Sequence, residues 1–354
     1  MKRIALLLFL VSTLAGAQTL WYPGHEMGLG GKLLATENPY HRADTSRYAF
    51  VGAERNLVMC PAGLTLHFKT NSKFIKLQAE YGYIYSGRTT NQLSVMGFDL
   101  YIRQDGRWLW ASAAVPSKGK EDQAFSLIAD MDGTEHECLV YLPMYSELRS
   151  LQVGLEEGAS LAVLPEASAF KLAVHGSSFT MGVSTSRSGM SYPMQLARRT
   201  GLTVLPFGMS GNCKLQPSFA QALSDAQFDA LLLDTFSNPS IEQIKERLFP
   251  FIEQVQAAHP GVPLIFQRTS YREYRNFNTA KESFEARRIE VADSLMAIAC
   301  KKYPDVYYLH PCATPKTHES SVDGIHPGDY GYTLWEQSIE KPLLKILRKY
   351  GYKR

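Results

Sequence analysis

The sequence lacks several features that mark specialised classes of protein. Its five cysteines in 354 residues fall at no spacing typical of zinc ligands, so we expect no metal site. It contains no long run of like charge, which argues against a nucleic-acid-binding or membrane-surface segment. No apolar run reaches the roughly 20 residues that a membrane-spanning helix needs. We therefore expect no integral membrane segment in the mature chain.

The chain also has little net charge. It carries 37 Lys and Arg against 34 Asp and Glu, a formal net charge of +3. Lys2 and Arg3 lie in a segment that we expect to be removed, which would leave 35 against 34, or about +1. This balance argues against nucleic acid or an anionic membrane as the main partner. The hydrophobic share of 45% is that of an ordinary globular protein, and the length predicts two domains.

The first seventeen residues resemble a signal peptide. Lys2 and Arg3 precede an apolar run from Ile4 to Val11, and the small residues Ala15-Gly16-Ala17 end the segment. This pattern predicts export to the periplasm or the medium, with cleavage after Ala17. Because no cysteine follows the small residues, we expect no lipid anchor.

An exported protein can form disulfides, and two pairs are possible here. Cys60 and Cys138 fall in one predicted domain, and Cys300 and Cys312 fall in the other. The positions of all five cysteines, including Cys213, are equally compatible with small buried thiols.

Residues 18–164 have the pattern of an all-β domain. Short segments in which apolar and polar residues alternate are separated by turn-forming residues, as in the Thr70-Asn71-Ser72 turn. Many strands at this spacing predict a sandwich, and no helix is evident. The expected strands are Leu64–Lys69, Phe74–Tyr81, Phe98–Ile102, Trp108–Trp110, Cys138–Leu142 and Leu151–Leu155.

From residue 168 to residue 354 the pattern changes to alternating strands and helices. Continuous apolar strands followed by helical segments predict a parallel sheet covered on both faces. The expected strands are Phe170–Val174, Thr203–Phe207, Ala230–Leu233, Val262–Phe266 and Val306–Leu309. The expected helices are Met190–Arg199, Ile241–Ala258, Ala280–Lys302 and Thr333–Tyr350.

Polar residues follow three of these strands, where a parallel sheet binds its ligands. Ser178 stands in a Gly-Ser-Ser turn after the first strand, where a hydroxyl would project beside free backbone N–H groups. Gly211 lies in a glycine-rich loop after the second strand, and Asn238 follows the third. Near the C-terminus, Asp323 precedes His326 by three residues, a spacing that lets the carboxylate hold the imidazole ring as a base.

In this order the four segments resemble the SGNH or GDSL-type serine hydrolases. Gly97-Phe98-Asp99-Leu100-Tyr101 also resembles the Gly-x-Asp-Leu-Tyr motif of the branch with an N-terminal β-sandwich. The resemblance covers nearly the whole mature chain. It implies a three-layer, flavodoxin-like α/β fold preceded by a jelly-roll-like sandwich.

The resemblance also implies roles for individual residues. Ser178 would be the nucleophile, His326 the base and Asp323 the residue that orients it. The N–H groups of Ser178 and Gly211, with the Asn238 side chain, would form the oxyanion hole. Two positions depart from the common pattern: Ser177 replaces the Asp of Gly-Asp-Ser, and Asp234-Thr235-Phe236-Ser237-Asn238 replaces Gly-x-Asn-Asp.

The expected activity is that of a carboxylic ester hydrolase that needs no metal or cofactor. The resemblance indicates removal of acetyl groups from glycans, with a lipase or lysophospholipase as the alternative enzyme. An inactive glycan-binding surface protein is an alternative of another class. We expect a short acyl group, because polar residues surround the candidate site in the sequence: His175, Ser177, Thr180, Asn212 and Lys214.

Overall fold

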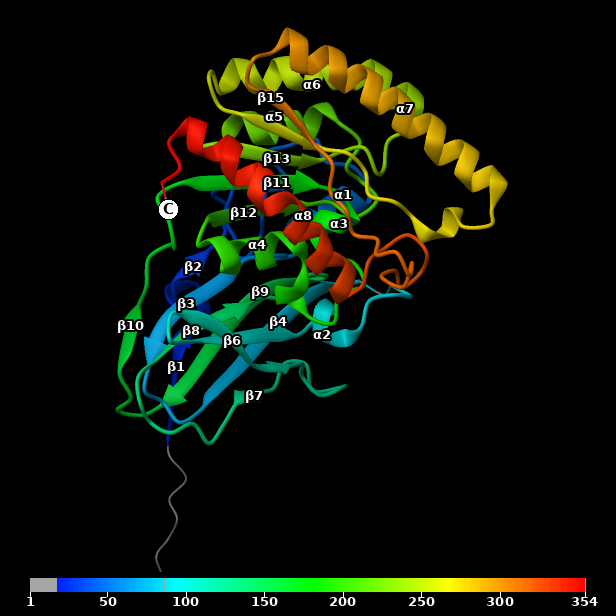
Figure 1. Cartoon of the computed structure of the whole chain (residues 1–354). Coiled ribbons are helices and arrows are strands. Elements are labelled where there is room, and N and C mark those ends of the chain that lie inside the picture. Colours follow the sequence, from blue (N-terminus) through cyan, green and yellow to red (C-terminus); the bar gives the residue numbers. More distant parts are fainter. Residues whose placement is uncertain (1–17, 86, 354) are drawn as a thin grey trace, which may run out of the picture.

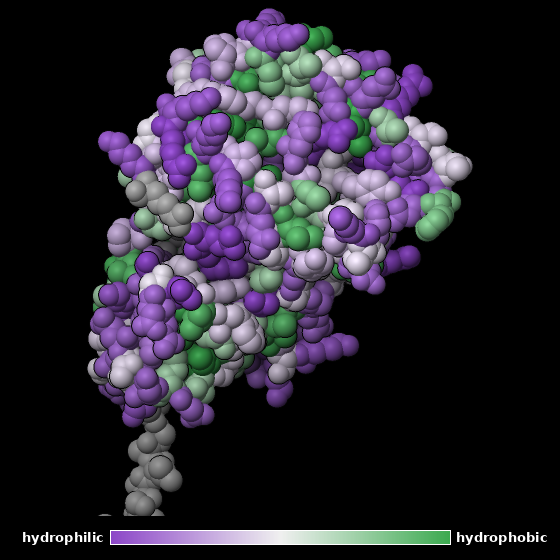
Figure 2. All heavy atoms as spheres, viewed as in Figure 1, coloured by the Kyte–Doolittle hydropathy of each residue, from purple (hydrophilic) through white to green (hydrophobic). Residues whose placement is uncertain are grey.

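The computed structural model describes residues 18–85 and 87–353. The expected signal peptide, residues 1–17, lies outside the described residues. Figure 1 shows an antiparallel β-rich half, drawn in blue to green, beneath a half in which helices flank a parallel sheet. The change from antiparallel to parallel strands falls between Val163 and Lys171. Charged and polar side chains cover most of the face visible in Figure 2, and hydrophobic ones form small separate groups.

Two antiparallel sheets form the first half. One has the order β1-β9-β4-β7, and the other has the order β10-β3-β8-β5-β6 with β2 paired to β3. The strands are β1 (Thr19–Pro23), β2 (Leu29–Gly30), β3 (Thr65–Thr70), β4 (Ile75–Ile84), β5 (Phe98–Gln104), β6 (Arg107–Ala114), β7 (Phe125–Ile128), β8 (His136–Tyr141), β9 (Ser146–Glu156) and β10 (Leu161–Val163). Alternate side chains of both sheets, such as Leu66, Leu77 and Val153, share one buried core, as expected of a sandwich.

The first half also contains two short helices that the sequence pattern did not predict. They are α1 (Ala53–Met59) and α2 (Gln92–Val95). Each is too short for a helical period to show in the sequence. Tertiary packing stabilises α1, because Leu57 and Val58 enter the core between the two halves.

The second half is a three-layer α/β structure. Its sheet has the order β12-β11-β13-β14-β15, and all of its strand pairs are parallel. The strands are β11 (Lys171–Gly176), β12 (Thr203–Gly208), β13 (Ala230–Asp234), β14 (Leu264–Gln267) and β15 (Val306–Leu309). The helices are α3 (Ser178–Met181), α4 (Tyr192–Thr200), α5 (Pro217–Asp225), α6 (Ile241–Ala258), α7 (Thr279–Lys302) and α8 (Asp329–Leu347).

Both faces of the parallel sheet are buried, which explains the continuous apolar strands. Along β13, Leu231 and Leu233 lie in the core beneath α5, α6 and α7. Ala230 and Leu232 lie in the opposite core, with side chains of α4 and α8. The alternation follows from the period of two in a strand. No helix within residues 18–85 and 87–353 is both long and apolar enough to cross a membrane.

All five cysteines are free thiols, so neither of the two possible disulfides is formed. Cys60 belongs to the core between the halves, whereas Cys138 belongs to the sandwich core. Cys300 packs against the sheet from α7, whereas Cys312 is exposed and its Sγ contacts the Thr314 carbonyl. The small-buried-thiol interpretation therefore describes Cys60, Cys138 and Cys213, and it is wrong for Cys312.

Thiol reactivity tests this arrangement. Burial raises the pKa of Cys60 and of Cys138 to about 12, which removes the reactive thiolate at neutral pH. We expect the native protein to react rapidly with an aromatic disulfide reagent at Cys312, and all five thiols to react after unfolding. A mapped disulfide between Cys60 and Cys138, or between Cys300 and Cys312, would contradict the structure.

The two halves share a hydrophobic core. Phe50 of the first half lies 5.1 Å from Phe219 of α5 between ring centroids. A Cβ added to Gly63 would lie 2.3 Å from the ring of Pro206 in β12, so the Gly63 backbone packs directly against that ring. The first half contributes these larger apolar side chains to the shared core: Leu33, Leu34, Tyr48, Phe50, Leu57, Val58, Val95, Met144 and Tyr145.

We expect the second half to be unstable without the first. Burying one large apolar side chain contributes roughly 1.5–3 kcal/mol, so uncovering five of their partners would cost about 8–15 kcal/mol. This equals the entire free energy of unfolding of a typical domain, about 5–15 kcal/mol. Residues 167–354 expressed alone should be insoluble or nearly inactive. A soluble fragment with the full activity of the whole chain would show that the first half is dispensable.

Candidate active site

The register of three neighbouring strands brings the candidate loops to one edge of the parallel sheet. Gly176, the last residue of β11, pairs with Gly208 at the end of β12 and with Asp234 at the end of β13. The chain therefore leaves three adjacent strands at one level, the position at which parallel sheets bind ligands. Ser178, Gly211 and Asn238 follow within four residues of these strand ends.

The turn after β11 is tight and carries two serines. A Cβ on Gly176 would lie 2.0 Å from Thr180 Oγ1, so only glycine lets α3 fold back onto the strand. Ser177 caps α3 by accepting the Phe179 N–H at 3.2 Å, and its hydroxyl donates to Asp234 at 2.6 Å. Ser177 is completely buried, whereas Ser178 retains 7% exposure. Only the second serine can reach a substrate.

Ser178, His326 and Asp323 form a connected hydrogen-bonded row. The distance from Ser178 Oγ to His326 Nε2 is 2.9 Å, and that from His326 Nδ1 to Asp323 Oδ2 is 2.8 Å. Asp323 Oδ1 also accepts the backbone N–H groups of Ile325 and His326. The loop thus folds back on itself as the Asp-x-x-His spacing predicts. In this arrangement Nδ1 donates to the carboxylate, which leaves Nε2 free to accept the serine proton.

The Asp323 carboxylate is held in its charged form. Burial raises its pKa, but hydrogen bonds from the ring and backbone of His326 outweigh burial and lower the pKa to about 2. Asp323 is therefore ionised throughout the neutral range. A charged carboxylate in this position can stabilise a protonated imidazole at His326.

Gly211 presents a free backbone donor on the loop that follows β12. It lies in a turn closed by the Asn212 N–H and the Met209 carbonyl at 2.9 Å, and its φ of 70° is one that favours glycine. Among the described residues, neither the Ser178 N–H nor the Gly211 N–H has a hydrogen-bond acceptor. Two unpaired N–H groups on adjacent loops are what an oxyanion requires.

The Asn238 side chain is oriented by the same loops. Its Oδ1 accepts the Cys213 N–H at 3.2 Å, so its Nδ2 group is left to donate elsewhere. Among the described residues, Nδ2 has no acceptor. Asn238 is therefore available as a third donor, even though its sequence context departs from Gly-x-Asn-Asp.

Asp234 connects the serine turn to the Asn238 loop, a role that the sequence analysis missed. One carboxylate oxygen accepts from Ser177 and Thr180, and the other accepts from Ser237 Oγ at 3.1 Å. The group is fully buried, and burial raises its pKa. A signal was present, because Asp234 is a charged residue at the end of an otherwise apolar strand.

A buried ionic cluster supports the Asn238 loop from behind. Arg272 and Arg288 both donate to the Ser237 carbonyl, at 2.6 and 3.1 Å, and both pair with Glu285. The carbonyl that precedes Asn238 is thereby held by two guanidinium groups. No sequence signal connects these residues, which come from the segment after β14 and from α7.

Three of the polar residues that suggested a short acyl group point away from the site. Ser177 and Thr180 are bound to Asp234. His175 is fully buried, donates its Nδ1–H to the Phe207 carbonyl at 2.8 Å, and contacts Cys213 through Nε2. Burial lowers the pKa of His175 to about 4, so it is neutral. These side chains contribute to the interior of the protein and say nothing about the acyl group.

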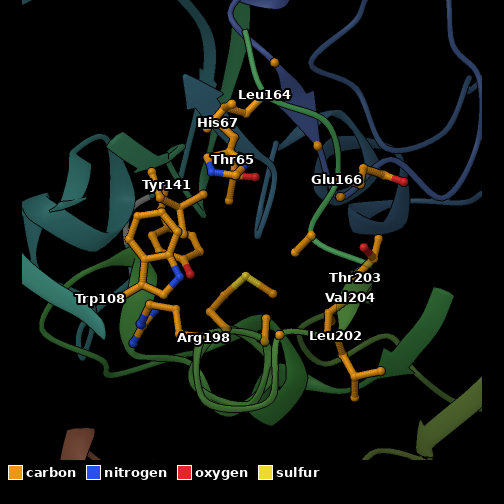
Figure 3. A pocket seen from close by; sticks show the side chains of 18 of the residues that line it. Thr65, His67, Trp108, Tyr141, Leu164, Glu166, Arg198, Leu202, Thr203 and Val204 are labelled. Atoms are coloured by element: carbon orange, nitrogen blue, oxygen red, sulfur yellow. The ribbon is translucent and has the colours of Figure 1, made fainter. Parts of the chain in front are cut away.

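A cavity of about 480 Å³ lies between the two halves, at the opposite end of β12 from Gly211. Figure 3 shows Trp108 and Tyr141 side by side on one of its walls, with Arg198 beneath them. Neither Ser178 nor His326 lines this cavity. Within the part of the chain that the structure describes, no group of three or more His, Cys, Asp or Glu side chains could hold a metal ion.

Comparison with known proteins identifies the family. Residues 19–161 match the family described as the N-terminus of SGNH-hydrolase-type esterases, and residues 170–344 match the GDSL-like lipase/acylhydrolase family. A solved structure from Bacteroides ovatus, described as that of a GDSL-like lipase, is 32% identical with a TM-score of 0.88. The match covers 94% of this chain and 98% of that one. The chain belongs to the GDSL-like lipase/acylhydrolase family. It is a carboxylic ester hydrolase of the SGNH type.

More distant structures share the fold of this GDSL-like hydrolase. A salicylyl-acyltransferase from a tetracycline biosynthetic pathway is 19% identical, with a TM-score of 0.69 over 95% of this chain and 97% of its own. A family two carbohydrate esterase from Cellvibrio japonicus is 11% identical, with a TM-score of 0.59 over 94% and 99%. No curated protein matches the sequence.

The geometry predicts a graded set of losses on substitution. Ser178→Ala and His326→Ala should each lower kcat by about 10⁴-fold or more, because each removes the covalent route. Asp323→Ala should cost less, since the base remains but loses its orientation, and Ser177→Ala should cost least. Steady-state kinetics with circular dichroism as the control for folding measures this order.

Labelling with a fluorophosphonate, followed by peptide mapping, tests the assignment directly. We expect the adduct on Ser178 and none on the Ser178→Ala variant. An adduct on Ser177, or no adduct on the folded wild-type protein, would overturn it.

Proposed function

We propose that this GDSL-like hydrolase is an exported serine esterase that removes acetyl groups from O-acetylated glycans. The observation that carries the esterase mechanism is the hydrogen-bonded row of Ser178, His326 and Asp323 beside two free backbone N–H groups. Support for a glycan substrate comes from the shared fold of family two carbohydrate esterases. Support for export comes from the signal-peptide pattern of residues 1–17.

The reaction begins with attack on the ester. Ser178 Oγ bonds to the acyl carbon while His326 Nε2 takes the hydroxyl proton, a contribution of about 10²–10⁴-fold. The negative charge that develops on the carbonyl oxygen is met by the N–H groups of Ser178 and Gly211 and by Asn238 Nδ2. Each such donor contributes roughly 3 kcal/mol where it has been measured in other hydrolases.

Collapse of this intermediate releases the sugar hydroxyl. The bond between the acyl carbon and the leaving oxygen breaks, and His326 gives its proton to that oxygen. Water then attacks the acyl-Ser178 ester, with His326 again taking a proton, and the second collapse frees acetate and restores the Ser178 hydroxyl. Asp323 remains charged in every step because its pKa is lowered to about 2.

A lipase or lysophospholipase is the alternative enzyme, and the name of the Bacteroides ovatus relative favours it. The two activities differ in the acyl group they accept. The alternative of an inactive glycan-binding protein is disfavoured, because all of the catalytic groups are present and connected.

Acyl-chain preference separates the two enzymes. For p-nitrophenyl esters we expect kcat/KM to fall from acetyl to butyryl and to be poor for octanoyl, because a site adapted to acetyl groups leaves no room for a longer chain. Release of acetate from acetylated plant and host glycans, measured by mass spectrometry, should exceed release of fatty acid from lysophospholipid. Ser178→Ala is the control. A kcat/KM that rises with chain length would favour the lipase, and no hydrolysis of any ester would favour the binding protein.

A further inference from the structure

A buried carboxylate of the sandwich faces the second half of the molecule. Asp99, the Asp of the Gly-x-Asp-Leu-Tyr motif, lies on β5 and is 1% exposed. Its Oδ2 accepts the Gly189 N–H at 2.8 Å, and its Oδ1 accepts Trp110 Nε1–H at 3.0 Å. Arg187 Nε lies 3.2 Å from Oδ1 and supplies the opposite charge. A charge this deeply buried is tolerated when it is paired and hydrogen-bonded in this way.

Arg187 connects Asp99 to Ser186. Its guanidinium donates to the Tyr101 hydroxyl at 3.1 Å and lies 5.1 Å from the ring centroid of Trp110, so sandwich residues surround it. Another of its N–H groups donates to Ser186 Oγ at 3.2 Å. The orientation of Ser186 therefore depends on a guanidinium that Asp99 holds.

Ser186 in turn binds Asp329, the first residue of α8. Its N–H donates to Asp329 Oδ1 at 2.8 Å, and its hydroxyl donates to Asp329 Oδ2. Asn91 of the sandwich also donates to the Ser186 carbonyl at 3.0 Å. Both oxygens of the Asp329 carboxylate are thus bound to one residue, whose own contacts lead back to the sandwich.

Asp329 stands three residues after His326, and only Pro327 and Gly328 separate them. The Gly328 N–H donates to the Ser320 carbonyl at 2.8 Å. The backbone between His326 and the start of α8 therefore has little freedom to adjust. A displacement of the helix start would move His326 relative to Ser178. Misplacement of a catalytic group by about 1 Å can cost roughly 10²-fold in rate.

We propose that Asp99 is a positioning residue for the catalytic base, acting through Arg187, Ser186 and Asp329 on the loop that carries His326. The proposal rests on the proposed role of His326. It assigns a function to the sandwich motif beyond holding the two halves together.

The chain offers a matched control for a merely structural role. Asp225 also bridges the halves, since its carboxylate accepts from Arg47 at 3.1 Å and from Tyr48 at 3.2 Å. It lies at the end of α5, and no hydrogen bond of the described residues connects it to the His326 loop. Asp225→Asn therefore makes the same chemical change at a contact that should not influence the base.

The test compares Asp99→Asn, Ser186→Ala, the double variant and Asp225→Asn in the whole protein. Readouts are kcat and KM for p-nitrophenyl acetate, the rate of fluorophosphonate labelling at Ser178, and the melting temperature. We expect Asp99→Asn and Ser186→Ala each to lower kcat and the labelling rate by about 10- to 100-fold, with KM nearly unchanged. The double variant should be little worse than the worse single one, because both act on one connection. Asp225→Asn should keep its kcat.

Each other outcome decides against the proposal. If the Asp99 and Ser186 variants keep their kcat and lose only melting temperature, as Asp225→Asn is expected to do, the connection is structural. Additive losses in the double variant would also overturn it. Should Asp99→Asn fail to fold, Ser186→Ala alone decides, because it removes one hydroxyl from a half-buried position. Labelling of Ser178 that survives His326→Ala would instead overturn the proposed function itself, whatever the Asp99 variant does.

Discussion

The alignment of three parallel strands at Gly176 is the constraint on which the site depends. Because Gly176 is level with Gly208 on one side and Asp234 on the other, three loops begin at the same height above the sheet. A shift of one residue in either pairing would exchange the faces of the strand and place buried side chains of one core in the other. The same alternation that buries both faces of the sheet therefore also sets the level of Ser178, Gly211 and Asn238.

Buried polar groups then convert this alignment into a rigid site. Asp234 joins the serine turn to the Asn238 loop, and the pair Arg272 and Arg288 holds the same loop from the other side. In the first half, Arg42 is buried and donates to the Gly208 carbonyl at 2.9 Å, just before the Gly211 turn. Burial lowers the pKa of Arg42 to about 10, but its carbonyl partners satisfy its donors.

The sandwich and the α/β half are therefore joined by a shared core and by direct contacts near the site. Their shared core includes Phe50 and Phe219, and the backbone of Gly63 packs against the ring of Pro206. Around the site, Tyr145 of the sandwich lies 2.6 Å from Ser210 between hydroxyl oxygens, beside the candidate oxyanion donor Gly211. The Bacteroides ovatus structure likewise matches across both halves, over 98% of its length.

The sequence by itself determined the elements whose cause is local. Apolar strands alternating with helices predicted the parallel sheet, and the short Asp-x-x-His spacing predicted the bond between Asp323 and His326, because both depend on near neighbours in the chain. It could not reveal the role of Arg42 or the short helix α1, whose partners lie far away in sequence. It also counted His175 and Thr180 among the polar residues around the candidate site, whereas the tertiary structure turns both side chains inward. Hydrogen bonds and burial between distant segments decide where a polar side chain points, and only the folded chain contains them.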